Sequence, residues 1–360
     1  MHRVLILADI NSPHTRRWVD ALLQNGFVIC VFSLSEPANY ENAFGEQLSI
    51  VSPKRRFASK AGYLSVLPQL KKCILNFAPD VLHAHYATSY GLLGALSGFS
   101  PFFISVWGSD ILSFPHKSFI HRNILKYSLG RADRVFATGK LLSDEVSRLF
   151  NISSEIIPFG IDVDKFYPNR TSTYYPAENL VIGTVKSMEE IYRIDWIIKA
   201  FAEVQRLRPA GNLRLLIVGG GSMLETYIGL AEKLCTPGTY TFTGKVPYSR
   251  IPELTSQLDI FVHAALGESF GVSTLEAAAC GKPAVVCNSG GACEVILENQ
   301  TALTYGEFDY NALVSQLLIL IDDKDLRISM GDNARSFVVT NFDWNVNVKR
   351  MIESYKEVLR

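Results

Sequence analysis

An alternation of short apolar runs with amphipathic stretches of helix length constrains the fold more than any other feature of this 360-residue chain. In the first half, buried strands are predicted at 4–8, 27–32, 81–83, 102–106, 134–137 and 156–158. Between the first two runs, segment 15–25 predicts a helix with Trp18, Leu22 and Leu23 on its apolar face, ended by Gly26. Strands separated by helix-length segments are typical of βαβ units and a parallel sheet.

The same alternation starts again after Asn169–Asn179, a polar stretch with the composition of a linker. Here strands are predicted at 181–184, 214–218, 239–243, 259–263 and 284–287, and helices at 196–206, 272–279, about 309–322 and about 343–358. A single core rarely grows beyond about 250–300 residues, so two domains are expected. The predicted fold class is α/β, with two doubly wound parallel-sheet domains in succession.

Charge and cysteine content exclude several classes of protein. The net charge is +0, which argues against wholesale nucleic-acid binding, although residues 1–165 carry +4 and the remainder −4. The six cysteines show no CxxC spacing, so we expect reduced, buried thiols in a cytosolic protein. The apolar run at the N-terminus is too short for a signal peptide, and no run of 18 apolar residues predicts a membrane span.

The segment Gly267–Pro283 carries the most chemical information. It follows a predicted strand and opens a predicted helix, whose unpaired N–H groups and partial positive charge suit an anion such as a diphosphate. Gly271 would let a ligand approach the backbone closely. Glu268 and Glu276 could accept hydrogen bonds from hydroxyls at the two ends of a sugar nucleotide. The alternative interpretation is a surface loop and helix with two solvated glutamates.

The context of these two glutamates, 268–283, resembles without a gap the Glu-x7-Glu hallmark of the large retaining glycosyltransferase family numbered four, which has the GT-B fold. Further matches, spread over nearly the whole chain, are Ser105–Asp110, Pro158–Asp162, Ile217–Gly221, Phe242–Val246 and Ser289–Glu294. The resemblance implies two Rossmann-like domains facing a central cleft. An acceptor-binding domain would span 1–163 plus about 343–360, a C-terminal helix that crosses back, and a nucleotide-sugar donor domain would span 164–342.

The resemblance also implies roles for matching positions. Glu276 would hold the ribose hydroxyls, Glu268 would contact hydroxyls of the donor sugar, and Lys186 would stabilise the charge on the leaving diphosphate. The other donor-binding positions it implies are Phe270, Gly271 and Val272 at the sugar, Thr274 and Leu275 at the diphosphate, Gly244, Lys245 and Val246 at the base, and Gly219 at the frame of the pocket.

One departure from the family pattern concerns the phosphates. Relatives usually carry a second lysine just before a glycine, whereas this chain has Ile191 or Tyr192 in place of the lysine and Arg193 in place of the glycine. Arg193 could restore the missing charge, since a guanidinium suits phosphate well. The alternative is weak donor binding.

Another departure concerns the acceptor side. Many relatives have a histidine before the Gly-Ser-Asp element, where this chain has Trp107, and the first loop, 11–14, lacks their paired glycines. Asp110 is the catalytic candidate on this side, and Asn11, His14 and His85 are candidates for acceptor binding, although a lone histidine is more often structural.

No metal or cofactor is expected. Asp162-Val163-Asp164 has the Asp-x-Asp form of a metal site in the other major transferase fold, but its place at a domain junction favours a linker or a helix cap. The resemblance implies front-face attack, in which the leaving diphosphate helps to take the acceptor proton and the protein supplies orientation and electrostatic stabilisation.

The predicted function is retaining, metal-independent transfer of a sugar from a nucleotide diphosphate sugar, with a UDP-sugar favoured over a GDP-sugar, to a hydroxyl of a glycan acceptor. Basic residues interleaved with Phe and Ile at 54–60 and 117–126 favour an anionic membrane surface, although an ordinary solvated face is the alternative. We therefore expect a cytoplasmic enzyme, peripheral at the inner face of the plasma membrane, that extends a lipid-linked glycan in cell-surface polysaccharide biosynthesis. The alternatives are a catalytically degenerate sugar-nucleotide binding protein and another GT-B enzyme, such as a sugar-nucleotide epimerase.

Overall fold

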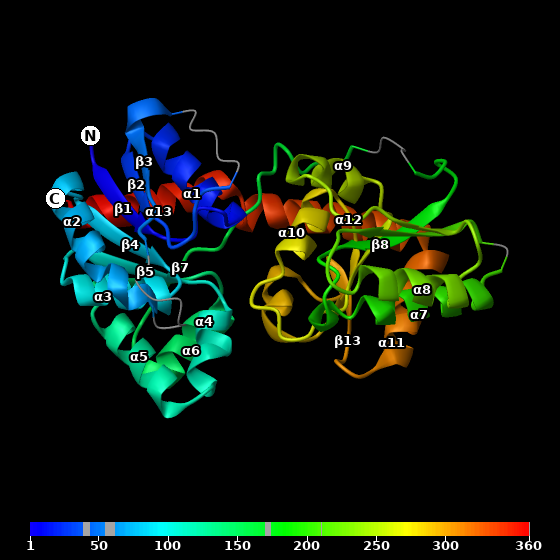
Figure 1. Ribbon diagram of the computed structural model, residues 1–360. Helices are drawn as coiled ribbons and strands as arrows, with labels where there is room; N and C mark the ends of the chain where they lie inside the picture. The colour runs from blue at the N-terminus through cyan, green and yellow to red at the C-terminus, as the bar shows by residue number, and fades with distance from the viewer. Residues whose placement is uncertain (39–43, 55–61, 170–173, 210, 360) are drawn as a thin grey trace. The chain divides into compact units, whose positions relative to one another are not determined.

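The computed structural model describes residues 1–38, 44–54, 62–169, 174–209 and 211–359 (Figure 1). The chain divides into two compact units: unit 1 comprises Met1–Phe159 and Asn345–Arg360, and unit 2 comprises Gly160–Trp344. Part of the basic segment singled out in the sequence, Arg55–Phe57 with Lys60, lies outside the described residues.

Unit 1 is built on a parallel sheet whose described strands run in the order β3-β2-β1-β4-β5-β6-β7. The strands are β1 (Arg3–Leu7), β2 (Val28–Phe32), β3 (Leu48–Val51), β4 (Val81–His85), β5 (Phe102–Val106), β6 (Arg134–Ala137) and β7 (Glu155–Ile156). The helices are α1 (Pro13–Gln24), α2 (Leu67–Phe77), α3 (Ser89–Ser97), α4 (Ser109–Leu112), α5 (Phe119–Gly130), α6 (Lys140–Phe150) and α13 (Trp344–Val358). Because the strand order turns outward from β1 in both directions, the sheet is doubly wound.

Both faces of the unit 1 sheet are buried. On one face, strand residues such as Leu5, Leu82 and Ile104 pack against α2, α3, α5 and α6. On the other face, Tyr355 of α13 lies fully buried and stacks on Phe103 of β5 with a centroid separation of 5.8 Å. Strands covered on both faces have nearly continuous apolar sequences, and for this reason they could be predicted from the sequence.

A buried polar cluster attaches α13 to this sheet. His83 of β4 lies 2.6 Å from the Tyr355 hydroxyl through Nδ1 and 2.8 Å from the Ser105 hydroxyl through Nε2. Burial lowers the pKa of His83 well below its ordinary value, so the ring is neutral. His83 is therefore a satisfied core histidine that joins the last helix to the central strands.

Unit 2 repeats the plan with a parallel sheet whose described order is β10-β9-β8-β11-β12-β13. Its strands are β8 (Leu180–Val185), β9 (Leu213–Val218), β10 (Tyr240–Phe242), β11 (Ile260–His263), β12 (Ala284–Cys287) and β13 (Ala302–Tyr305). Its helices are α7 (Ile194–Leu207), α8 (Leu224–Leu234), α9 (Ile251–Ser256), α10 (Val272–Ala279), α11 (Tyr310–Asp322) and α12 (Lys324–Asn341).

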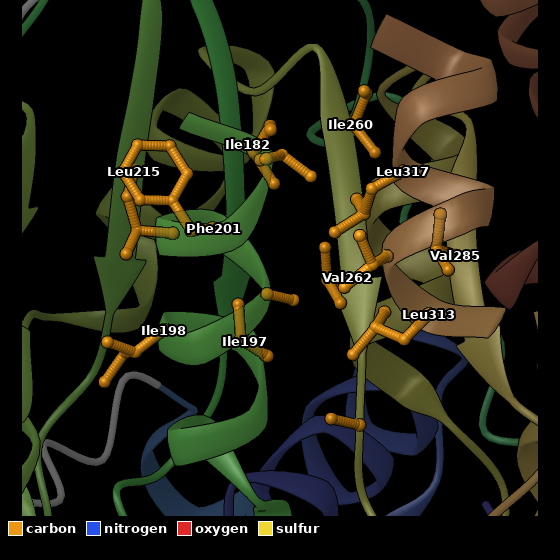
Figure 2. Close-up of a cluster of buried hydrophobic side chains, with 14 of the residues drawn as sticks. Ile182, Ile197, Ile198, Phe201, Leu215, Ile260, Val262, Val285, Leu313 and Leu317 are labelled. Atoms are coloured by element: carbon orange, nitrogen blue, oxygen red, sulfur yellow. The ribbon is translucent and has the colours of Figure 1, made fainter. Parts of the chain in front are cut away.

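Side chains along the unit 2 strands alternate between two apolar layers, as the two-residue repeat of a strand requires. Figure 2 shows the first layer, in which side chains of α7 and α11 meet those of the strands: Ile182, Ile197, Ile198, Phe201, Leu215, Ile260, Val262, Val285, Leu313 and Leu317. Intervening strand residues, such as Leu216 and Phe261, pack on the opposite face with Leu254 of α9 and Ala277 of α10. The sheet is thus a rigid frame for the segments that leave its strands.

Several elements were not assigned from the sequence, among them α12, β3 and β13. Only two helices were expected after residue 308, but the 18-residue α12 lies between them, and its buried residues are few and mostly small: Met330, Gly331, Ala334 and Val338. An added Cβ on Gly331 would overlap the carbonyl of Gly281, so α12 packs on the end of α10 by backbone contact rather than through an apolar stripe. Strands β3 and β13 were also missed, because short runs containing Ser or Thr gave no clear strand signal.

Among the described residues, no helix combines the length and the apolar character that a membrane crossing requires.

Candidate active site

Neighbouring strands β8 and β11 bring Lys186 and His263 to one edge of the unit 2 sheet. Lys186 directly follows β8, His263 is the last residue of β11, and the parallel register sets Phe261 beside Gly183. Ligands of open parallel sheets bind beyond the carboxyl ends of the strands. The segments leaving these two strands are therefore where a site is expected.

Helix α10 begins at this edge, and its N-terminus is the candidate site for an anion. Gly271, at φ 90°, is its N-cap, and an added Cβ there would approach the Ala292 Cα to 3.1 Å. The amides of Thr274 and Leu275, which were expected to meet the diphosphate, donate instead to the Gly271 carbonyl at 3.0 and 3.2 Å. The N–H groups of the first helical residues point out of the helix end, where the helix dipole adds positive potential.

Two glycines hold the loop before α10 in place. An added Cβ on Gly290 would overlap the carbonyl oxygen of Glu268, and one on Gly291 would overlap that of Ser269. Moreover, the Gly291 amide donates to the Glu268 carbonyl at 2.7 Å. The loop therefore rests directly on the Gly-Gly backbone, and any larger residue would displace Glu268.

Glu268 lies at the centre of a polar cluster. Its Oε1 forms an ion pair with the ammonium of Lys186, and its Oε2 lies 2.5 Å from Nε2 of His263. The Lys186 ammonium also donates to the Ser273 hydroxyl at 3.2 Å and lies 4.9 Å from the Tyr192 ring centroid. A cation, a carboxylate and the start of a helix thus meet within one small volume.

Opposing effects act on the Glu268 carboxyl. Burial raises its pKa, but the charge of Lys186 and the hydrogen bonds from His263 and Lys186 prevail and lower the pKa to about 2. Glu268 is therefore an acceptor-only carboxylate at neutral pH, suited to sugar hydroxyls and unsuited to act as a proton donor.

The segment that carries Lys186 is supported by the glycines after β9. Gly219, at φ 134°, leaves no room for a Cβ beside the Lys186 carbonyl, and the Lys186 amide donates to the Val218 carbonyl at 2.9 Å. Gly219 also forms a bridge with Gly244, and an added Cβ on Gly220 would lie 2.9 Å from the Lys245 amide. Gly219 therefore holds the Lys186 segment and the Gly244 segment in place through close backbone packing.

Glu276 lies in the second turn of α10. Its side chain is buried, and its Oε1 accepts a hydrogen bond from the Tyr248 hydroxyl at 2.9 Å. Tyr248 belongs to the short turn Tyr248–Arg250, which follows the Gly244–Val246 segment and is itself exposed. The two glutamates of the motif thus stand at successive positions along α10, each with a defined partner.

In unit 1, the residues expected on the acceptor side also lie at one sheet edge, because β1, β4 and β5 are adjacent. The Asp110 carboxylate is buried and accepts hydrogen bonds from the amides of Ala87 at 3.0 Å, Trp107 at 3.2 Å and Gly108 at 2.8 Å. Burial raises the pKa of Asp110, and the hydrogen bonds from these amides lower it only in part. The Asp110 carboxylate therefore ties the loop after β4 to the loop after β5.

The other expected acceptor-side residues are packed against neighbouring groups. His14 stacks on Phe159 with a centroid separation of 4.2 Å, and the His85 ring lies 4.7 Å from that of Trp107. Burial lowers the pKa of His14 to about 4 and that of His85 to about 3, so both rings are neutral at pH 7. The Asn11 amide donates to the Glu36 carbonyl at 2.8 Å and fixes the first loop.

Comparison with known proteins decides the family. Residues 3–139 match the model of glycosyl transferase 4-like domains, and residues 169–337, which hold the α10 site, match that of glycosyl transferases group 1. The chain belongs to the group 1 glycosyltransferases. It is an enzyme that transfers a sugar from a nucleotide-sugar donor.

Curated relatives and solved structures agree with this family. The chain is 25% identical to the N-acetyl-alpha-D-glucosaminyl L-malate synthase of Bacillus anthracis, over 78% of this chain and 75% of that protein. It is 30% identical to a GDP-mannose-dependent phosphatidylinositol monomannoside mannosyltransferase of Mycolicibacterium smegmatis, over 55% of either chain. The fold matches sucrose-phosphate synthase from Thermosynechococcus elongatus, with a TM-score of 0.85 at 18% identity over 100% of this chain and 99% of that one. The predicted GT-B fold class is thus confirmed.

Ile191 and Arg193, the positions at which the sequence departs from the expected phosphate contacts, lie directly before α7. Ile191 is 55% exposed and carries no charge. Arg193, at φ 50° before α7, places its guanidinium 3.4 Å from the Trp196 ring centroid and donates to the Glu307 carbonyl at 2.5 Å. These contacts direct Arg193 toward α7 and Glu307, whereas Lys186 contacts Ser273 in the first turn of α10.

Sequence reasoning missed His263, Ser273 and Tyr248 in this glycosyltransferase. His263 was included in a predicted strand, and its place at the carboxyl end of that strand was the signal that it faces the site edge. Ser273 lies inside the recognised motif, but its hydroxyl was not considered as a partner of Lys186. Tyr248 carries no local signal, because only the fold brings it to Glu276.

No group of three or more His, Cys, Asp or Glu side chains that could hold a metal occurs among the described residues. Asp162 of the Asp-x-Asp segment instead pairs with Lys165 at 2.8 Å and accepts a hydrogen bond from its amide at 3.2 Å.

Proposed function

We propose that the enzyme is a retaining glycosyltransferase that takes its sugar from a UDP-sugar, with a GDP-sugar as the alternative, and adds it to a hydroxyl of a lipid-linked glycan. The observation that carries the proposal is the meeting of Lys186, Glu268 and the start of α10 at one sheet edge. A sugar 1-diphosphate presents adjacent hydroxyls and anionic oxygens, and these groups match the carboxylate and the cationic helix end respectively.

The site supports catalysis by electrostatic stabilisation. As the bond between the sugar and the diphosphate breaks, negative charge grows on the leaving oxygen, where the Lys186 ammonium and the positive potential at the start of α10 would stabilise it. Glu268, kept ionised, would orient the sugar through its hydroxyls, and Glu276 would hold the ribose. Retention would follow from attack on the same face as the departing diphosphate, which takes up the acceptor proton. None of these roles requires a metal.

The surface of α5 in unit 1 supports a membrane-bound acceptor. Phe119 and Ile120 at the start of the helix are 78% and 69% exposed, and they line a shallow hollow of about 410 Å³ with apolar residues of α3. Four basic residues on or next to α5 are exposed as well: Lys117, Arg122, Lys126 and Arg131. Exposed apolar side chains among basic ones suit the anionic surface of a bilayer.

A thermal-shift screen against UDP, GDP and ADP, with and without EDTA, tests the donor proposal. A ligand that binds the native state raises the melting temperature by mass action. We expect a shift with one nucleotide that persists in EDTA and is lost in Glu276→Ala. If no nucleotide at millimolar concentration shifts the transition, the donor proposal is wrong.

Cosedimentation with vesicles containing anionic phosphatidylglycerol at low salt tests the membrane proposal. The wild type should pellet, whereas a Phe119→Ser/Ile120→Ser variant, altered only at exposed positions, should stay in the supernatant. Equal pelleting of the two proteins, or none by the wild type, would contradict the α5 assignment.

The departures at Ile191 and Arg193 favour one alternative, a sugar-nucleotide binding protein without turnover. The two functions differ in one readout, because the alternative predicts a thermal shift with no release of nucleoside diphosphate from any UDP- or GDP-sugar across a broad set of glycan acceptors.

A further inference from the structure

Two cysteines of unit 1 that the glycosyltransferase site does not use lie in contact. Cys30 is on β2 and Cys73 is on α2, 43 positions apart in the chain, and their Sγ atoms are 3.7 Å apart. Both side chains are buried. By contrast, the described thiols of Cys235, Cys280 and Cys293 contact oxygen atoms: the carbonyls of Ile198 and Pro252 and the side chain of Asn288.

A surface hollow gives access to this thiol pair. The hollow, about 520 Å³, is lined by both cysteines together with Ser49 and two cationic side chains, Arg3 and Lys72. The hollow therefore brings solvent up to the two cysteines, although their side chains are largely buried.

The surroundings of the pair favour a thiolate on Cys30. The hydrogen bond between the two thiols, together with Ser49 and the charge of Arg3, outweighs burial and lowers the pKa of Cys30. The same hydrogen bond and burial raise the pKa of Cys73. In addition, the Arg3 Nε atom is buried and has no hydrogen-bond partner among the described residues. One sulfur is thus the nucleophile and the other the resolving thiol.

We propose that Cys30 and Cys73 are a reversible dithiol–disulfide site. With hydrogen peroxide, the Cys30 thiolate attacks one oxygen, the O–O bond breaks, and a sulfenic acid and hydroxide form. The Cys73 sulfur then attacks the Cys30 sulfur to form the S–S bond, the S–O bond breaks, and the sulfenic oxygen leaves as water with the Cys73 proton. Overall, two thiols lose two electrons and two protons, and peroxide becomes two waters. Reducing thiols reverse the change by exchange.

Formation of the Cys30–Cys73 disulfide requires the two sulfur atoms to move together. A disulfide bond is about 2.05 Å long, so the Sγ atoms have to approach by roughly 1.7 Å from the observed 3.7 Å. Rotation of the Cys73 side chain on α2 and a small shift of that helix can supply this distance. The resulting bond would join β2 covalently to α2 on the face of the sheet away from α13.

Peroxide treatment of the full-length protein, followed by alkylation and mass spectrometry of tryptic peptides, tests the proposal. Titration with hydrogen peroxide should lower the number of labelled thiols from six to four. It should also produce one linked species, lighter by two hydrogens than the sum of the peptides carrying Cys30 and Cys73, and dithiothreitol should remove it. Oxidation should raise the melting temperature of unit 1, because a cross-link restricts the unfolded chain.

Two single variants make the test specific. Cys73→Ala should abolish the linked species, whereas Cys235→Ala, which removes an equally buried cysteine without a sulfur neighbour among the described residues, should leave it unchanged. Failure of the wild type to form the Cys30–Cys73 link, or the loss of two thiols in Cys73→Ala, would overturn the proposal. Linked peptides in the wild type are decisive even if Cys73→Ala folds poorly.

Discussion

Replacing Glu268 by glutamine should destabilise unit 2 by an amount that depends on pH. Folding lowers the pKa of this carboxyl from 4.5 to about 2. A lowered pKa contributes stability that is present above the pKa of the unfolded chain and is lost as the pH falls through the folded value. Since one pKa unit corresponds to about 1.4 kcal/mol, the contribution is about 3 kcal/mol at pH 7.

The same relation gives a contribution of only about 1 kcal/mol at pH 3, where both states are partly protonated. Urea titrations read by hydrogen exchange in peptides of β11 and α10 would report unit 2 alone. The difference in free energy of unfolding between wild type and Glu268→Gln should therefore shrink by about 2 kcal/mol from pH 7 to pH 3. Glu232→Gln on the exposed face of α8 serves as the control and should change stability by less than about 0.5 kcal/mol at both pH values. If the two proteins have equal free energies of unfolding at pH 7, or if their difference is the same at pH 7 and pH 3, the reasoning is refuted.

Further predictions follow from individual contacts. Tyr248→Phe removes the hydrogen bond to Glu276, so steady-state kinetics should show a KM for the donor raised by about threefold to tenfold with kcat unchanged. Gly291→Ala forces a Cβ onto the Ser269 carbonyl, so donor binding measured by calorimetry should fall at least tenfold while the far-UV spectrum remains that of a folded protein. Asp110→Asn keeps the shape but weakens the bonds to three amides, and unit 1 should lose roughly 1–3 kcal/mol in chemical denaturation. His263→Phe leaves the ion pair of Lys186 and Glu268 in place but removes one of its supports, and kcat/KM should fall about tenfold to hundredfold.

The fold was predictable because most strands are covered on both faces. Runs such as Phe102–Val106, Arg134–Ala137 and Ala284–Cys287 are strands with the expected bounds, and α10 begins and ends where the sequence indicated. By contrast, α12 was not predictable from apolar periodicity, because it packs through Gly331 on the Gly281 backbone. A contact between two glycines leaves no hydrophobic pattern in either segment.

The candidate site was predictable only in its local part. Gly271 and the two glutamates lie on one continuous segment, and their arrangement follows from a loop that enters a helix. The partners of those glutamates come from other segments. Lys186 and His263 reach Glu268 through the parallel register of β8 with β11, and Tyr248 reaches Glu276 from a separate turn. The engagement of Arg193 with Trp196 and Glu307 likewise depends on tertiary packing that no spacing reveals.

Calorimetric titration of UDP and of GDP into the wild type, Lys186→Ala and Glu276→Ala would test most directly whether the start of α10 is the donor site. The account predicts that the wild type binds one of the two nucleotides, that EDTA does not change the affinity, and that each substitution weakens it at least tenfold. Lys233→Ala, which removes an exposed lysine of α8, should bind like the wild type. Binding that survives both site substitutions, or that vanishes on chelation of metals, would contradict the account.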